Sequence, residues 1–437
     1  MKNKALVIFL SIIMFFIGGV AGVGGLAYIT LPYSEELVET DRVYYSLSDK
    51  DNTVAVATGV QEAQEGAVSV HFLELGNKYA GDCTYIKVGT DIDILIDCGS
   101  KTNSIATVSA YLNNYVTDGT LEYVIITHAH EDHYAGFATT TKIDSIFDLY
   151  ECETIITFSN TNQRTSADYI QQSISTSEEI SIHGITSYAN TNNKPVSKMY
   201  ANFNRELADE INNGATHLIA SDVINQYTDG KIVLDEENNI DLQILNSQYY
   251  STKAGSDNDY SVCAMVNQGD KHFIFTGDLE ADGEEFLVQL NNLPQVELYK
   301  AGHHGSKTSS TMALLNVIKP KIVCVCCCAG SKEYTETEAN QFPTKKFINH
   351  VSQFTTQVYV TTLCVDYDND VFTSFNGNIV VMAKKDDIEV SVYCSNNTIV
   401  LKDTDWFKTE RLEMCKLPDK DGKDEVLLHP SWYETAS

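Results

Sequence analysis

The sequence is poor in basic residues. Its 30 lysines and arginines stand against 60 aspartates and glutamates, which gives a formal net charge of −30. The acidic residues are spread along the chain, and no cluster of lysines and arginines offsets them. Such clusters supply the affinity of proteins that bind the phosphate backbone of nucleic acids. Strong passive binding of nucleic acid is therefore not expected.

Prolines are scarce as well, and the cysteines form no recognisable disulfide framework. Only seven prolines occur, 43% of the residues are hydrophobic, and no repeat or low-complexity tract stands out, as is typical of an ordered globular protein. Eleven cysteines are present, four of them at 324, 326, 327 and 328 within an apolar stretch. We interpret these four as small core residues on a buried strand, with disulfides or metal thiolates as the alternative.

A single long uncharged run occurs, at residues 5–31, after Lys2 and Lys4. This run is long enough to cross a bilayer, and the two lysines before it predict a cytoplasmic N-terminus with the rest of the chain outside the cell membrane. A signal peptide cleaved near Ala21, which would make the protein secreted, is the alternative. The predicted units are a membrane anchor or signal peptide (1–31), a linker (32–66), a folded domain (67–395) and a C-terminal extension (396–437).

Two sets of strands, each with a helix, follow one another along the folded domain. The first set comprises strands at 68–75, 85–88, 92–97 and 121–127 and a helix over 105–116. The second set comprises strands at 240–245, 261–267, 272–276 and 296–300 and a helix over 279–290. Between them, residues 139–213 are largely polar and end in a predicted helix at 199–213. The order predicts an α/β fold in which two sheets pack together with helices outside.

The segment Thr127-His-Ala-His-Glu-Asp-His133 carries the strongest chemical signal. Three of the eleven histidines and an aspartate follow directly after the strand at 121–127. Imidazoles two residues apart at a strand end can converge on one cation, while the next Asp and His turn toward a second. The segment therefore predicts half of a dinuclear metal site.

The other half of this site has two candidates, each after an apolar strand. Asp278 ends Thr276-Gly-Asp278, and the pair His303 and His304 lies within Gly302-His-His-Gly-Ser306. The order of the three motifs along the chain makes coincidence improbable.

These motifs resemble the metallo-β-lactamase superfamily, and within it the extracellular hydrolase domain of ComEC-type bacterial competence proteins. The matching stretches are Gly81-Asp-Cys-Thr-Tyr-Ile, Ile94-Leu-Ile-Asp-Cys-Gly99, HAHEDH, Asn258-Asp-Tyr-Ser-Val262, Phe275-Thr-Gly-Asp278 and Lys300-Ala-Gly-His-His-Gly-Ser306. The resemblance spans residues 68–383 and implies an αββα sandwich with metals at one edge of the two sheets.

The resemblance also implies roles for individual residues. His128 and His130 would hold the first metal, Asp132 and His133 the second, and Asp278 would bridge them. One of His303 and His304 would complete the set. Asp97 would brace the site through hydrogen bonds without being a ligand.

A metal-ligating histidine of many superfamily members, between HAHEDH and the bridging aspartate, has no clear counterpart. Only His183, His217 and His272 lie in that interval. His272 is interpreted as structural, and the other two are weak candidates. The first metal is therefore expected to have an incomplete ligand set.

Two divalent ions, zinc or alternatively manganese, suit these ligands and would lower the pKa of a shared water, so the expected nucleophile is a metal-bound hydroxide. Asp132 would orient it, and the non-ligating member of His303/His304 would protonate the leaving group. Ser306, Lys307 and Thr308 are candidate phosphate contacts, with helix capping as the alternative. Lys300 is a further candidate for such a contact, or a residue that merely ends its strand.

The sequence thus predicts a metal-dependent hydrolase that cleaves phosphodiester bonds at the cell surface. Hydrolysis of another ester class, or a non-catalytic surface binding protein that retains the fold, is the alternative. A β-lactamase is disfavoured by the HHGS context.

Overall fold

The computed structural model describes residues 55–57, 64–138, 144–163, 180–189, 197–418 and 426–433. The predicted membrane segment and most of the predicted linker lie outside these ranges. Within them, no helix is both long and apolar enough to span a bilayer.

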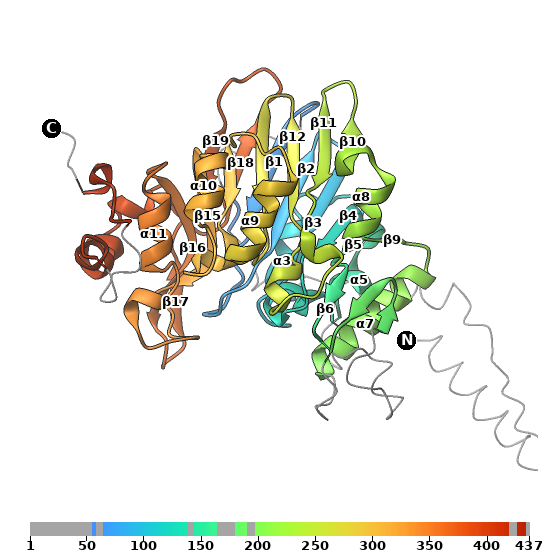
Figure 1. Ribbon diagram of the computed structural model, residues 1–437, viewed down its shortest axis with the longest axis horizontal. Coiled ribbons are helices and arrows are strands. Elements are labelled where there is room, and N and C mark those ends of the chain that lie inside the picture. Colours follow the sequence, from blue (N-terminus) through green and yellow to red (C-terminus); the bar gives the residue numbers. More distant parts are fainter. Residues whose placement is uncertain are drawn as a thin grey trace, which may run out of the picture. The chain divides into compact units, whose positions relative to one another are not determined.

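Eight strands form the first sheet, in the order β19-β18-β1-β2-β3-β4-β5-β9 (Figure 1). They are β1 (Val68–Phe72), β2 (Thr84–Val88), β3 (Ile92–Ile96), β4 (Thr120–Ile126), β5 (Glu151–Thr157), β9 (Thr216–Ile219), β18 (Ile379–Ala383) and β19 (Ser391–Cys394). The pairs from β19 to β3 are antiparallel, whereas β3, β4, β5 and β9 run parallel. The central strand β4 therefore delivers its C-terminal loop to one edge of the sheet.

The second sheet also has eight strands, in the order β10-β11-β12-β13-β14-β15-β16-β17. They are β10 (Lys231–Asp235), β11 (Ile240–Ile244), β12 (Ala264–Gln268), β13 (Lys271–Phe275), β14 (Leu298–Lys300), β15 (Ile322–Ala329), β16 (Gln357–Asp366) and β17 (Val371–Ser374). The strands β13 to β16 are parallel, and the outer pairs are antiparallel. Both sheets are therefore mixed.

The two sheets pack face to face through a core of aliphatic and aromatic side chains. Phe72 of β1 and Phe275 of β13 meet across this core, with ring centroids 6.4 Å apart. On β1 the neighbouring His71 points to the opposite face, where it contacts Tyr111 of α3 (Ser104–Leu112). Side chains of a strand alternate between the two faces of its sheet, and on β1 both faces are covered.

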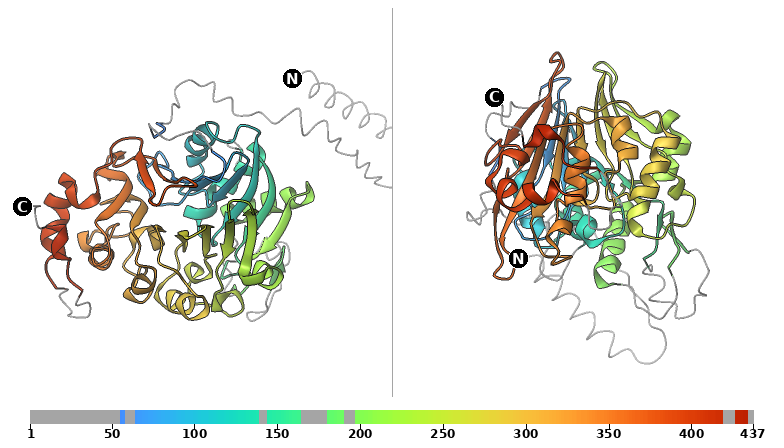
Figure 2. Two further views of the ribbon diagram at one scale, coloured as in Figure 1. Left: turned by 90° about the horizontal axis from the view of Figure 1, so that it is seen from above. Right: turned by 60° about the vertical axis from the view of Figure 1, so that its left-hand side comes forward.

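Helices cover the outer face of the second sheet. They are α9 (Ala281–Leu290), α10 (Met312–Ile318) and α11 (Lys345–Val351). Leu287, Leu314 and Phe347 of these helices join Ile274 and Val323 in a second hydrophobic core. Figure 2 shows these helices on one side of the paired sheets. The predicted arrangement of two sheets with helices outside is confirmed.

The largely polar segment 139–213, for which the sequence predicted only a helix at its end, also supplies strands. It contributes β5 to the first sheet, besides α5 (Ile146–Leu149), α7 (Lys198–Asn212) and a small sheet of β6 (Asn160–Thr161), β8 (Ile185–Ser187) and β7 (Ile180–Ile182). The first half of β5, Glu151-Cys-Glu-Thr154, carries three polar residues in four, which hid the strand. The remaining helices are α4 (Glu131–Tyr134), α8 (Ala220–Gln226) and α12 (Leu412–Cys415).

The four clustered cysteines all lie on β15 and are buried. Cys324 and Cys326 point into the core between the sheets, and Cys327 points into the outer core. All eleven cysteines fall within the described ranges, and none of them is in a disulfide.

Candidate metal centre

Three loops meet at one edge of the sandwich. HAHEDH follows β4, Asp278 follows β13, and the His303/His304 pair follows β14. Because β13 and β14 are parallel, their C-terminal loops emerge at the same edge. Val262 N donates to Thr127 O at 2.9 Å, which ties the loop of the first sheet to the second.

The loops pack so closely that glycine is required. A Cβ atom on Gly99 would lie 1.6 Å from the carbonyl oxygen of Asp132. The backbone N–H of Asp82 donates to that same oxygen at 3.1 Å, and Cys98 N–H donates to the carbonyl of His133 at 2.8 Å. The backbone of the HAHEDH loop is thus fixed by its neighbours in the first sheet.

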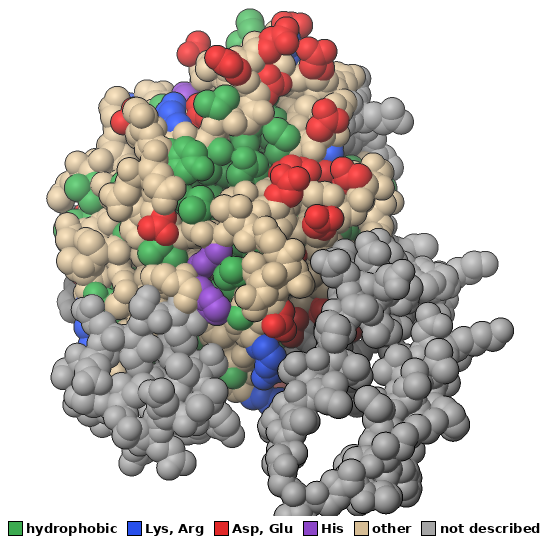
Figure 3. Space-filling view, turned by 90° about the vertical axis from the view of Figure 1, so that its right-hand side faces the viewer, with side chains coloured by type: hydrophobic (Ala, Val, Ile, Leu, Met, Phe, Trp, Pro, Cys, Tyr) green, Lys and Arg blue, Asp and Glu red, His purple; other side chains and the backbone are tan. Residues whose placement is uncertain are grey.

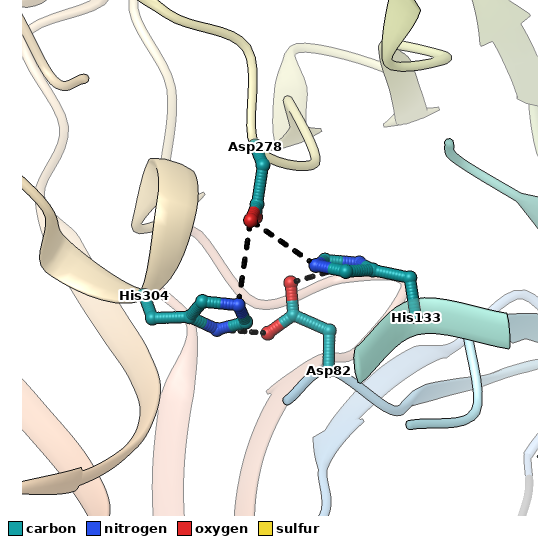
Figure 4. Close-up of side chains that lie close together, drawn as sticks. All are labelled: Asp82, His133, Asp278 and His304. Atoms are coloured by element: carbon teal, nitrogen blue, oxygen red, sulfur yellow. Dashed lines mark ion pairs between the residues drawn. The ribbon is translucent and has the colours of Figure 1, made fainter. Parts of the chain in front are cut away.

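Asp278, His133, His304 and Asp132 converge in the interior of this edge. Asp278 Oδ2 lies 3.2 Å from His133 Nε2 and 3.4 Å from His304 Nε2. Asp132 Oδ2 lies 3.4 Å from the same His304 nitrogen. Figure 4 shows the carboxylate of Asp278 facing both rings. Two imidazole nitrogens and two carboxylates are a ligand set that suits a divalent cation.

Several atoms of this cluster lack a hydrogen-bond partner although they are buried. They are His133 Nε2, His304 Nε2, Asp278 Oδ1 and Asp82 Oδ1. A buried polar atom without a partner typically costs about 1–3 kcal/mol, so native proteins rarely leave four together. A cation bound among them would give partners to the two imidazole nitrogens and to Asp278. The residues therefore fit a resident metal.

The opposite side of each ring, at Nδ1, is braced by oxygen atoms. His133 Nδ1 lies 2.7 Å from Asp97 Oδ2, and Thr127 donates to Asp97 from both its backbone N–H and its hydroxyl, at 2.7 Å each. His304 Nδ1 lies 3.0 Å from the carbonyl of Cys326. Both rings then carry the proton on Nδ1 and turn Nε2 toward the cluster. Asp97 therefore lies where it can hold the His133 ring by a hydrogen bond to Nδ1.

The charges of the cluster depend strongly on one another. Burial alone would lower the pKa of His133, but the carboxylates of Asp278 and Asp97 raise it well above the ordinary value. Burial would raise the pKa of Asp278, yet His133 and His304 hold it well below its usual range. Burial and the neighbouring imidazoles lower the pKa of His128, which keeps it neutral and able to act as a ligand.

His128 and His130 form a second pair beside this cluster. His128 Nε2 and His130 Nδ1 face each other at 3.0 Å, and the rings of His128 and His133 are 4.2 Å apart between centroids. Two nitrogens this close can bind the same cation. The structure thus brings the four HAHEDH ligand candidates together with Asp278.

The two adjacent histidines differ in position. His304 is 1% exposed and belongs to the buried cluster, whereas His303 lines an open cleft and its Nε2 lies 3.6 Å from Asp278 Oδ2. Both residues have positive φ, 48° for His303 and 54° for His304, a conformation that costs energy for a side-chain-bearing residue. This turn sends the two rings in different directions.

The cleft beside the cluster has a volume of about 670 Å³. Asp132, Asp278, His130 and His303 line it. Its other lining residues include Lys101, Glu131, Ser306, Lys307, Glu333, Tyr334, Asn340 and Phe342. The Tyr334 hydroxyl donates to Asp132 Oδ2 at 3.3 Å, and the Tyr334 and Phe342 rings are 5.5 Å apart. Sequence reasoning missed both aromatic residues, because they follow no recognisable motif.

Ser306 and Lys307 line the cleft, but they do not lie at a helix N-terminus. Helix α10 begins at Met312, and its N-terminus is capped by the Thr311 hydroxyl. Thr308 instead contacts the Ser306 hydroxyl and His303 Nδ1, each at 3.1 Å. Helix capping by Ser306 or Thr308 is therefore wrong, and a phosphate contact there would not use the helix end.

The remaining candidate histidines are engaged elsewhere among the described residues. His217 Nε2 lies 2.9 Å from the hydroxyl of Thr157, and its ring centroid is 6.4 Å from that of His183. His272 Nδ1 lies 2.7 Å from Asn267 Oδ1 on the neighbouring strand. Burial lowers the pKa of His217 to about 4.

Asp82 also lies at the cluster and was assigned no role from the sequence. It is 3% exposed, and one of its oxygens lies 3.2 Å from His304 Nδ1. Asp82, His133, Asp278 and His304 are close enough to be taken for one four-ligand site. However, the contacts of Asp82 are with Nδ1 of both rings, at 3.2 and 3.8 Å, whereas those of Asp278 are with Nε2. Asp82 thus contacts the nitrogen of each ring that Asp278 does not contact.

Comparison with known proteins gives a consistent family signal over part of the chain. Residues 76–143 match the model of the metallo-beta-lactamase superfamily. "Recombination protein 2" of Haemophilus influenzae is 33% identical over 84 residues, which are 19% of this chain and 10% of that protein. "ComE operon protein 3" of Bacillus subtilis is 31% identical over 85 residues, 18% of this chain and 11% of that protein. The similarity thus spans about a tenth of each relative.

Two solved structures show weaker similarity. The metallo-beta-lactamase fold protein YhfI from Bacillus subtilis has 10% identity and a TM-score of 0.32, with 68% of this chain and 96% of that chain covered. Metallo-beta-lactamase SMB-1 bound to 2-mercaptoethanesulfonate has 14% identity and a TM-score of 0.27, with coverage of 55% and 81%.

Proposed function

We propose that this metallo-beta-lactamase superfamily protein, which is distantly similar to the ComEC/Rec2 competence proteins, is a metal-dependent hydrolase of phosphodiesters. The observation that carries the proposal is the group of unpaired buried ligand atoms on His133, His304 and Asp278, next to an open cleft. A scaffold that had lost catalysis would gain nothing from keeping these atoms buried without partners.

The ligands divide into two groups around Asp278. Asp132, His133 and His304 would hold one ion, His128 and His130 would hold the other, and Asp278 would contact both. Zinc or manganese suits these donors. Such a pair, when bound, lowers the pKa of a coordinated water toward neutrality and polarises the bond to be cleaved.

The protein's own side chains would supply orientation and proton transfer. Asp132, which accepts a hydrogen bond from the Tyr334 hydroxyl, would orient the attacking water. His303 faces the cleft and would donate a proton to the leaving group. Lys101, Lys307 and Ser306 offer positive charge and a hydroxyl to a phosphate in the cleft.

The purified protein is expected to bind two divalent ions per chain, because five nitrogen and carboxylate groups converge around Asp278. Elemental analysis after supplementation with zinc or with manganese measures this. Fewer than one equivalent in every preparation would contradict the proposed centre.

Small or zwitterionic phosphodiesters are expected to compete well with long DNA as substrates. The net charge of −30 repels polyanions, and in Figure 3 acidic side chains clearly outnumber basic ones on the face shown. Raising the ionic strength screens this repulsion, so hydrolysis of DNA should be unchanged or faster. Rates on a choline-bearing phosphodiester and on duplex DNA, at low and moderate salt, measure the preference. A dominant DNA rate that falls steeply with salt would argue for a basic groove instead.

We also propose that the catalytic domain lies at the cell surface, anchored by residues 5–31. The support is the uncharged run behind Lys2 and Lys4. Protease added to intact cells should then remove the domain, with a cytosolic marker protein as the control. Complete protection of the chain together with that marker would rule out this location.

A further inference from the structure

Asp82 is held in place by the same loops that carry the metal ligands. Its backbone N–H donates to the carbonyl of Asp132 at 3.1 Å, and its carbonyl accepts from Gly99 N–H at 2.9 Å. The side chain has little freedom to approach the cluster from another side. Its position is therefore determined by the backbone of the HAHEDH loop and of the loop after β3.

The carboxylates of Asp82 and Asp278 contact different nitrogens of the His133 and His304 rings, and Figure 4 shows the Asp82 carboxylate between the two rings with Asp278 above them. Asp278 contacts the Nε2 atoms, which have no hydrogen-bond partner, and Asp82 contacts the Nδ1 atoms. A cation held by Nε2 of both rings would have Asp278 as a further ligand. The contacts of Asp82 with the Nδ1 atoms are those of a carboxylate that supports a ligating histidine.

A buried lysine compensates the charge of Asp82. Lys300 is the last residue of β14, is 3% exposed, and its Nζ pairs with Asp82 Oδ2. Lys300 lies four positions before His304, on the strand that delivers the loop of that histidine. The ion pair therefore links the loop before β2 to the strand that positions His304. An unpaired charge at this depth would be strongly unfavourable, so each member depends on the other.

We propose that Asp82 and Lys300 form a positioning pair for His304 and so set the affinity of the metal site, without contributing a ligand. The carbonyl of Cys326, 3.0 Å away, accepts a hydrogen bond from Nδ1 of His304, and the negative charge of Asp82, with Oδ1 3.2 Å from the same nitrogen, also favours the proton there. That tautomer leaves the lone pair of Nε2 free for a cation. The inference rests on the proposed metal centre and extends it to two residues outside the ligand set.

The test is the metal affinity and stoichiometry of Asp82→Asn, measured by calorimetric titration of zinc into the metal-depleted full chain. A positioning role predicts that the variant still binds two ions, with the affinity of one site lowered by about 10–100-fold. Activity should then recover as the zinc concentration rises. A loss of one whole equivalent would identify Asp82 as a ligand and overturn the proposal. So would an unchanged affinity with a lower melting temperature, because the pair would then be merely structural.

The first sheet offers a matched control. Asp93 and Lys87 form another buried pair, with Asp93 Oδ2 2.8 Å from Lys87 Nζ, at the end of β3 remote from the cluster. Asp93→Asn should lower the melting temperature but leave both metal affinities unchanged. If it weakened zinc binding as much as Asp82→Asn does, the effect would be one of general stability.

A second variant covers the case in which Asp82→Asn does not fold. The double variant Asp82→Asn with Lys300→Met leaves no uncompensated buried charge, and its zinc affinity should fall by a similar factor. The failures are distinguishable: a wild-type chain that binds no metal would overturn the proposed function. A wild-type chain that binds two ions, with unchanged affinity in the double variant, would overturn only the positioning role.

Discussion

Replacement of Asp278 by alanine is expected to reduce turnover by about 10³-fold or more, because metal ions stabilise a hydrolytic transition state by several kcal/mol. Asp278 lies 3.2 Å from His133 Nε2 and 3.4 Å from His304 Nε2, lines the same cleft as His130, and is proposed to serve both ions. Its removal therefore affects both ions, whereas loss of a terminal ligand such as His130 first affects one. His130→Ala is expected to abolish most of the activity as well. Steady-state rates and metal content of the purified variants measure both effects.

The fold should survive these changes, because the ligands lie in loops at the edge of the sheets and not in either hydrophobic core. His272→Ala is a suitable control, since His272 lies on β13 but contacts Asn267 and not the cluster. That variant should keep its metal and most of its activity. Wild-type turnover in both Asp278→Ala and His130→Ala would show that the site has been wrongly assigned.

The second large effect is expected from replacing His303 or His304 by alanine, and the two variants should lose activity for different reasons. His303→Ala should lower kcat by about 10²-fold or more and leave the metal content unchanged, as loss of a general acid does. The reason is that His303 lines the cleft, while His304 is buried with its Nε2 unpaired. His304→Ala should instead lose bound metal.

Measuring metal content and kcat on both variants separates the two roles. A substrate with a good leaving group, which needs no proton, should restore much of the rate of His303→Ala but not that of His304→Ala. Loss of one ion from His303→Ala, with full retention in His304→Ala, would mean that the assignment of the two histidines must be exchanged.

The sequence by itself predicted the type of fold and most residues of the candidate metal centre. HAHEDH, the Gly277-Asp278 turn and the His303/His304 pair are each short, each follow an apolar strand, and occur in a fixed order. Strand patterns depend on neighbouring residues, so the strands that lead into the motifs could be predicted from local alternation. Strands β9, β10 and β16 to β19 were not predicted individually, and neither was β5, whose polar first half gave no local signal although its parallel pairing with β4 and β9 places it inside the sheet.

Only the tertiary structure decided how the side chains around the metal site divide their work. The side chains of adjacent residues in an irregular turn do not follow a regular alternation. His303 and His304 point to different places because both have positive φ angles, and no sequence pattern predicts those angles. Asp82 and Lys300 are 218 positions apart, and Tyr334 and Asp132 are 202 apart. Contacts over such distances depend on how both sheets pack, and the physical reason they escape sequence reasoning is that no local pattern of residues records them.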